Sequence, residues 1–176
     1  QKGFLFLALA ALTRPDGALI YVVAAVYSAL AGLRRLDRQL VGAQMRTHLP
    51  AMLVVLPVWI AKSIYYGDIV PNTFYAKSAY HAFASQGVVY TALFARSYWL
   101  FSALTLLALL LSLSLRASGR LYAAVIAVWI AYVIYVGGDF MFARFLVPIL
   151  PAACLLLHEA ASDLLHRRPA LRMALC

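Results

Sequence analysis

The sequence predicts an all-α fold, a polytopic bundle of transmembrane helices. Three observations lead to this prediction. Hydrophobic residues make up 65% of the chain, charged residues make up only 12%, and the mean hydropathy is +0.87. The apolar residues stand in long runs and show no strand-like alternation, which is typical of membrane-spanning helices. A soluble domain of 176 residues could not cover so much apolar surface with so few charges.

About six helical spans account for the apolar runs. The first, at residues 3–12, reaches across only about half of a bilayer core and is interpreted as a partial span. Five further spans are predicted at residues 17–33, 50–66, 97–115, 121–136 and 143–157. Pro148 and Pro151 are expected to kink the last of these spans. We predict a single transmembrane domain over 1–176, and we expect it to be a fragment that lacks N-terminal spans and a first outer loop.

Residues 78–98 are rich in aromatic side chains and do not form a further span. One interpretation is an amphipathic helix that lies in the membrane interface and guides a lipid substrate. The other is an aromatic belt that anchors the span after it. The sequence leaves both open.

The cations set the orientation. If residue 1 is cytoplasmic, ten of the fifteen Lys and Arg residues lie on the cytoplasmic side and five lie outside, which obeys the positive-inside rule. We therefore interpret the net charge of +9 as topogenic and expect no nucleic-acid partner. Two cysteines indicate no disulfide framework, and no His, Cys or carboxylate spacing indicates a metal site, although outer carboxylates are compatible with a divalent cation.

Three polar motifs fall on the predicted outer face, and each places an acid near a cation. They are TRPDG at 13–17, YGDIVPNTFYAK at 66–77 and GDFMFAR at 138–144. An ionised group in lipid is costly unless it is paired, close to water or functional. We therefore expect the three motifs to gather on one face of the membrane and to form a site there.

Each motif also has a structural interpretation. In TRPDG, Thr13 can cap the next helix and Asp16 suits its first turn, which leaves Arg14 unexplained. The second motif can be an ordinary outer loop with interfacial tyrosines. In the third, Asp139 can cap the next helix while Arg144 reaches back to the surface, or the two charges can pair.

The functional interpretation is transfer from a lipid-linked sugar phosphate. Such a reaction needs cations that hold the phosphate and a carboxylate that takes a proton from the acceptor hydroxyl. Asp139 and Asp16 are the catalytic candidates. The substrate-binding candidates are the remaining polar residues of the three motifs: Arg14, Asp68, Asn72, Thr73, Tyr75, Lys77 and Arg144. A transporter is expected to carry charges near mid-membrane, and the middles of the complete spans lack acids.

The ordered set TRPDG, YYGDIVPNTFYAK and VGGDFMFAR resembles the family of bacterial membrane glycosyltransferases typified by the mycobacterial terminal β-1,2-arabinofuranosyltransferase. This family belongs to the C superfamily of glycosyltransferases, and the resemblance covers roughly residues 4–151. It implies a glycosyltransferase C-type fold and inverting transfer from a polyprenyl-phosphate pentose to a glycan, lipid or protein hydroxyl. It also implies a multi-pass location in the bacterial cell membrane, with the functional motifs on the extracytoplasmic face.

Enzymes of this superfamily place a key catalytic acid in the first outer loop, and no such loop precedes TRPDG in this sequence. The resemblance therefore implies that the principal base lies outside this chain. It assigns Asp139, Arg144, Arg14 and Lys77 to substrate binding and charge stabilisation. Two alternatives stay open: a polymerase or ligase of lipid-linked glycans, and a membrane transporter or scaffold without enzymatic activity.

Overall fold

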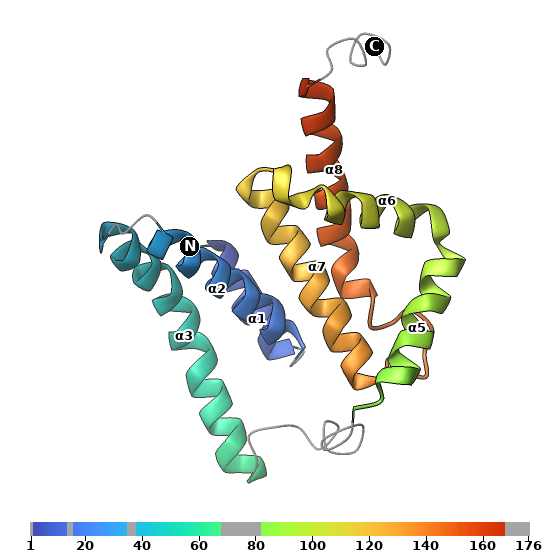
Figure 1. Ribbon diagram of the computed structural model, residues 1–176. Coiled ribbons are helices and arrows are strands. Elements are labelled where there is room, and N and C mark those ends of the chain that lie inside the picture. Colours follow the sequence, from blue (N-terminus) through green and yellow to red (C-terminus); the bar gives the residue numbers. More distant parts are fainter. Residues whose placement is uncertain (1, 14–15, 35–37, 68–81, 168–176) are drawn as a thin grey trace. The chain divides into compact units, whose positions relative to one another are not determined.

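The computed structural model describes residues 2–13, 16–34, 38–67 and 82–167 (Figure 1). Within these ranges every regular element is a helix, so the all-α prediction is confirmed for the described part of the chain. Contacts divide the chain into two compact units, Gln1–Tyr80 and His81–Cys176. The units are described separately, and the single transmembrane domain over 1–176 stays a prediction.

The first unit consists of α1 (Lys2–Thr13), α2 (Gly17–Arg34) and α3 (Arg38–Tyr66). Small residues let the helices approach one another: Ala8, Ala24 and Ala51 are buried, and a Cβ on Gly17 would lie 2.9 Å from the carbonyl oxygen of Ala10. Membrane helices pack through small residues of this kind because lipid provides little hydrophobic force between them.

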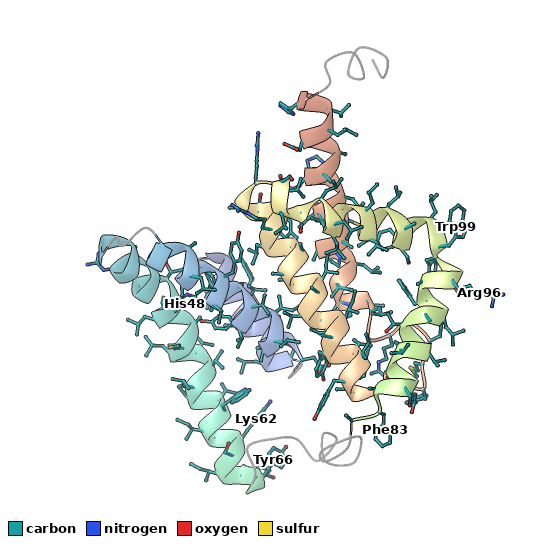
Figure 2. The ribbon with its side chains drawn as sticks, viewed as in Figure 1. His48, Lys62, Tyr66, Phe83, Arg96 and Trp99 are labelled. Carbon is teal, nitrogen blue, oxygen red and sulfur yellow. The ribbon has the colours of Figure 1, made fainter. Side chains whose placement is uncertain are left out.

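Aromatic side chains join the three helices of the first unit. The hydroxyl of Tyr21 on α2 forms a hydrogen bond of 3.0 Å with Nδ1 of His48 on α3. The ring of Phe4 on α1 meets that of His48 edge to face, with 4.3 Å between the centroids. After this junction α3 continues to Tyr66 with large exposed apolar side chains such as Ile64. Figure 2 labels His48 in the first half of α3 and Lys62 and Tyr66 towards its end.

The second unit contains α5 (Ala84–Ser97), α6 (Trp99–Leu110), η1 (Ser112–Ser114), α7 (Ala117–Val136), η2 (Val147–Ile149) and α8 (Leu150–Arg167). α7 packs against both α5 and α8 and supplies more of the buried core than any other helix of this unit. The largest fully buried side chains are Trp129, Ile126 and Val133 of α7, together with Leu146 and Leu156.

α5 and α6 form a sharp elbow, with 109° between the two helices. Arg96 and Trp99 stand on either side of this elbow in Figure 2. α5 lies against the end of α7, where a Cβ on Gly87 would collide with the backbone of Ile134. A helix is therefore confirmed within the aromatic segment 78–98, and it is packed on a neighbouring helix through a buried glycine.

Three helices are long and apolar enough to cross a membrane, over Arg46–Tyr66, Ala117–Val136 and Val147–His166. The bent pair α5 and α6 would be a fourth span if it crosses as one unit. This supports a membrane protein; within the described residues three or four helices can span, against the five full spans and one partial span predicted. α1 and α2 are apolar helices of shorter length, Gly3–Thr13 and Gly17–Gly32.

Two predicted spans have different limits in the structure. The span at 97–115 is wrong as one helix, because the elbow precedes Trp99 and α6 ends at Leu110. The span at 143–157 starts too early, because residues 142–146 form turns and the helical backbone begins at Val147. Pro148 lies in η2 and Pro151 in the first turn of α8, where a missing N–H breaks no helical hydrogen bond. The two prolines therefore begin the last span and do not kink it.

Candidate functional site

The predicted pair Asp139 and Arg144 lies on the connection between α7 and η2. We call residues 137–146 the Asp139 loop. α7 ends because Gly137 has a φ of 91°, and the N–H groups of Gly137 and Gly138 both donate to the carbonyl of Val133, at 3.1 Å each. The alternative in which Asp139 caps the next helix is wrong, because the next helical residue is Val147.

The backbone of the Asp139 loop is strained at one position. Ala143 has a φ of 61° and is the only non-glycine residue with positive φ in the described part of the chain. The left-handed region costs a residue with a Cβ about 1–2 kcal/mol. Such a conformation persists only where surrounding contacts fix it, and it is found at functional sites more often than elsewhere.

Hydrogen bonds from two helices fix the Asp139 loop. The hydroxyl of Tyr90 on α5 donates to the carbonyl of Met141 and accepts from the N–H of Phe145, both at 3.1 Å. The indole N–H of Trp129 on α7 donates to the carbonyl of Phe145 at 2.6 Å. Tyr90 and Trp129 are both buried, so these bonds are shielded from competing water.

The start of the Asp139 loop is also closely packed against α5. A Cβ on Gly138 would lie 2.5 Å from Cγ of the Tyr90 ring, and one on Gly137 would lie 2.6 Å from Cβ of Phe83. The N–H of Phe83 donates to the carbonyl of Tyr135 at 3.1 Å. Both glycines therefore serve two needs at once, positive φ and close approach of the neighbouring helix.

The structure brings Asp139 and Arg144 together. Oδ2 of Asp139 lies 3.6 Å from Nη1 of Arg144, and Oδ1 accepts from the N–H of Phe140 at 2.9 Å. The Asp139 side chain is 2% exposed, whereas that of Arg144 is 50% exposed. A carboxylate this deeply buried requires a nearby cation, which Arg144 supplies. The pairing alternative of the sequence interpretation thus describes the observed geometry.

This arrangement can bind an anion. A guanidinium carries five N–H donors in a rigid fork that matches carboxylate and phosphate oxygens. Nη1 of Arg144 lies beside Asp139 and also donates to the sulfur of Met141 at 3.5 Å, and half of the Arg144 side chain is exposed, so a ligand can reach it. The buried carboxylate limits the positions that Arg144 can take, which lowers the entropy lost when a phosphate binds.

An apolar cavity of about 390 Å³ lies within the same unit. Its lining comes from α5, α6, α7 and the start of α8, and includes Phe94, Trp99, Phe101, Ile126, Leu146 and Ile149. The size lies within the range of small-molecule sites. Leu146 ends the Asp139 loop, so one short segment contributes both to the charged pair and to the cavity wall. The lining is suited to hydrocarbon and not to a free sugar.

Asp16, the other catalytic candidate, lies in the first unit directly before α2. Its carbonyl accepts from the N–H of Leu19 at 3.1 Å. The prediction that Thr13 caps this helix is wrong, because Thr13 is the last residue of α1 and its hydroxyl donates to the carbonyl of Ala10 at 2.8 Å. Arg14 lies outside the described residues.

Apart from Tyr66 at the end of α3 and Gly67 directly after it, the second motif lies in residues 68–77, which are outside the described part of the chain. Its candidates are Asp68, Asn72, Thr73, Tyr75 and Lys77. Asp16 and Asp139 belong to different units. The gathering of the three motifs on one face therefore stays a prediction, and the geometry of the site rests on the Asp139 loop.

Sequence reasoning missed Tyr90 and Trp129 as residues of this site. Tyr90 bonds to groups 51 and 55 positions away, so no local spacing relates it to the Asp139 loop. The richness of 78–98 in aromatic residues is visible in the sequence, but it does not separate buried Tyr90 from exposed neighbours such as Tyr98. Over the residues with described placement, no group of three or more His, Cys, Asp or Glu side chains could hold a metal ion.

Comparison of the chain with protein-family models, with curated proteins and with solved structures found no match. The resemblance to the arabinofuranosyltransferase family rests on the three sequence motifs and stays a prediction.

Proposed function

We propose that this chain is an integral membrane glycosyltransferase, with the Asp139 loop as part of its donor site. It moves a sugar, such as arabinofuranose, from a polyprenyl-phosphate donor to a glycan, lipid or protein hydroxyl on the extracytoplasmic face of a bacterial membrane. The observation that carries the proposal is the half-exposed Arg144, held beside buried Asp139 in a strained and hydrogen-bonded loop.

Arg144 binds the phosphate of the donor in this proposal. As the glycosidic bond breaks, negative charge develops on the departing phosphate, and a fixed guanidinium stabilises that charge more in the transition state than in the ground state. The 50% exposure of the side chain leaves N–H donors available for this role.

Asp139 orients Arg144. Its side chain is almost fully buried, so it meets the guanidinium and not bulk solvent. The proton of the acceptor hydroxyl then goes to a different carboxylate.

The apolar cavity supports a lipid-linked donor. A hydrocarbon chain is the ligand that its lining suits, and Leu146 places part of the wall directly after the Asp139 loop. A soluble nucleotide sugar has no comparable apolar part to bury there. The three apolar helices of spanning length provide the membrane setting in which such a donor is found.

Sugar transfer from a polyprenyl-phosphate donor by the full-length protein in lipid nanodiscs tests this proposal. We expect Arg144→Ala to lower kcat/KM about 100-fold or more and Arg144→Lys to recover only part of it, since an ammonium lacks the guanidinium fork. Asp139→Asn is expected to lower it about tenfold. Arg120→Ala, which removes an exposed cation at the start of α7, is the matched control and should transfer at the wild-type rate.

Two results would count against the proposal. Wild-type protein that transfers no sugar from any polyprenyl-phosphate donor would end it. Unchanged turnover in both Arg144→Ala and Asp139→Asn would reduce the Asp139 loop to a structural element.

A further inference from the structure

We infer that Tyr90 is the positioning residue of the candidate site, because its hydroxyl holds the Asp139 loop in the one conformation that presents Arg144 beside Asp139. The inference rests on the proposed function, which gives the position of Arg144 its importance. Tyr90 itself contacts neither charged group in the bonds described above; it acts through the backbone that carries them.

The hydroxyl of Tyr90 uses both of its hydrogen-bonding capacities on the loop. It donates to the carbonyl of Met141 and accepts from the N–H of Phe145, so it bridges the backbone on both sides of Arg144. A hydroxyl is the smallest group that can donate and accept at one point. A phenylalanine at the same position would fill the space of the ring and leave both backbone groups without this partner.

The bridged segment is the strained one. Ala143, with a φ of 61°, lies between Met141 and Phe145. A residue with a Cβ leaves the left-handed region when nothing opposes it. Such a change would rotate the peptide before Arg144 and move the guanidinium away from Asp139. The Tyr90 bridge opposes this change from both ends of the segment.

The ring of Tyr90 contacts the other end of the loop as well. Its atoms lie so close to Gly138 that a Cβ there would be 2.5 Å from Cγ. α5 itself packs closely against α7 at Gly87. Trp129 fixes only the Phe145 carbonyl. Tyr90 is thus the side chain that touches the loop before Asp139 and on both sides of Arg144.

Tyr90→Phe is the direct test, with Tyr135→Phe as matched control because Tyr135 is 59% exposed at the end of α7. Both variants are made in the full-length protein in nanodiscs. We expect the amides of 141–147 to exchange with deuterium at least tenfold faster in Tyr90→Phe and at the wild-type rate in Tyr135→Phe. Transfer from the polyprenyl-phosphate donor should fall about 10- to 100-fold in Tyr90→Phe, because a displacement of about 1 Å can cost 100-fold.

A double-mutant cycle separates positioning from general stability. If Tyr90 acts by placing the Arg144 and Asp139 pair, its loss should cost much less in an Asp139→Asn background, where the pair is already disturbed. If Tyr90 contributes only to general stability, Tyr90→Phe should lower the transfer rate by the same factor with Asp139 and with Asn at that position. That result would overturn the inference.

If Tyr90→Phe does not fold, the double variant Tyr90→Phe with Ala143→Gly keeps the inference testable. Glycine accepts the left-handed backbone without the Cβ cost, so we expect folded protein and part of the transfer to return. A folded double variant with wild-type exchange and wild-type transfer would show that the hydroxyl is dispensable. A double variant that recovers neither folding nor transfer would show that the strain at Ala143 has no role.

The exchange measurement does not depend on catalysis. Wild-type protein without transferase activity would refute the proposed function, while exchange in Tyr90→Phe would still decide whether the Tyr90 bridge holds the loop. Unchanged exchange and unchanged transfer in Tyr90→Phe would overturn the inference and leave the proposed function standing.

Discussion

α3 and α7 are both apolar helices of spanning length, yet their surroundings differ. Only 6% of the apolar window of α3, within Arg46–Tyr66, is buried, against 33% for α7. α3 exposes large side chains such as Leu53 and Ile64. α7 buries Ile126, Trp129 and Val133 against α5, α8 and the Asp139 loop.

Hydropathy identifies both helices as apolar spans but does not show which one is buried in the protein. In a membrane, apolar side chains suit lipid and protein interior almost equally, so helices associate through small residues and hydrogen bonds. The second unit has such features around α7: Gly87 on α5, and the hydrogen bonds of Trp129 and Ser118 to other segments. Matched substitutions on α3 and α7 therefore test whether these features make the difference.

The largest expected effect is at Trp129. Trp129→Ala should destabilise the protein by about 3–5 kcal/mol, because it empties a buried site and removes the donor to the Phe145 carbonyl. Trp59→Ala on α3, where the indole is 38% exposed, should cost about 1 kcal/mol or less. Unfolding in mixed micelles with increasing SDS measures both. Equal losses would show that α3 is buried as deeply as α7 in the intact protein.

The second-largest loss of stability is expected at Gly87. Gly87→Ala places a Cβ against the backbone of Ile134, which cannot yield as a side chain would, and we expect a loss of about 1–3 kcal/mol. Gly42→Ala on α3 has open space around the new methyl group and should stabilise its helix by about 0.5–1 kcal/mol. Apparent melting temperatures in detergent should move in opposite directions. A fall for Gly42→Ala would show that α3 is packed there.

The sequence predicted the all-α class because its composition and its long apolar runs leave no other class, and it located α2 and α7 closely because each coincides with one apolar run. For α3 it found only the apolar second part, because the helix begins at Arg38 in a polar stretch. It failed where one run contains a break. The elbow before Trp99 and the turns at 142–146 could not be located by hydropathy, because each adjoins a long apolar run and its backbone depends on tertiary contacts.

The site was predictable to a similar degree. Asp139 and Arg144 could be found because charges in apolar sequence are conspicuous, and their spacing allowed pairing. Tyr90 and Trp129 could not be found, since aromatic residues are common in this chain and their partners lie on distant segments. The strain at Ala143 depends on those contacts, so no local pattern encodes it.

A smaller effect is expected at Ser118. Its hydroxyl on α7 donates to Oε1 of Glu159 on α8 at 2.7 Å. Ser118→Ala removes a hydrogen bond to a carboxylate and should cost about 1.5 kcal/mol, the low end for a bond to a charged group, because the pair is only partly buried. Ser63 on α3 donates only to the carbonyl of Trp59 in its own helix, at 2.9 Å, so Ser63→Ala should change stability by less than about 0.5 kcal/mol. SDS titration of the two variants gives the comparison directly.

The smallest effect concerns the first half of α3, where the contrast with α7 should weaken. Tyr21 on α2 forms a hydrogen bond with His48, so this part of α3 has a polar contact between helices like those around α7. Tyr21→Phe should cost about 0.5–1.5 kcal/mol, while Tyr65→Phe, 81% exposed near the end of α3, should cost nothing measurable. Thermal unfolding in detergent checks both. If Tyr21→Phe is as neutral as Tyr65→Phe, packing of small residues and aromatic rings holds α2 to α3 without help from this hydrogen bond, and hydrogen bonds between helices matter only in the unit that carries the Asp139 loop.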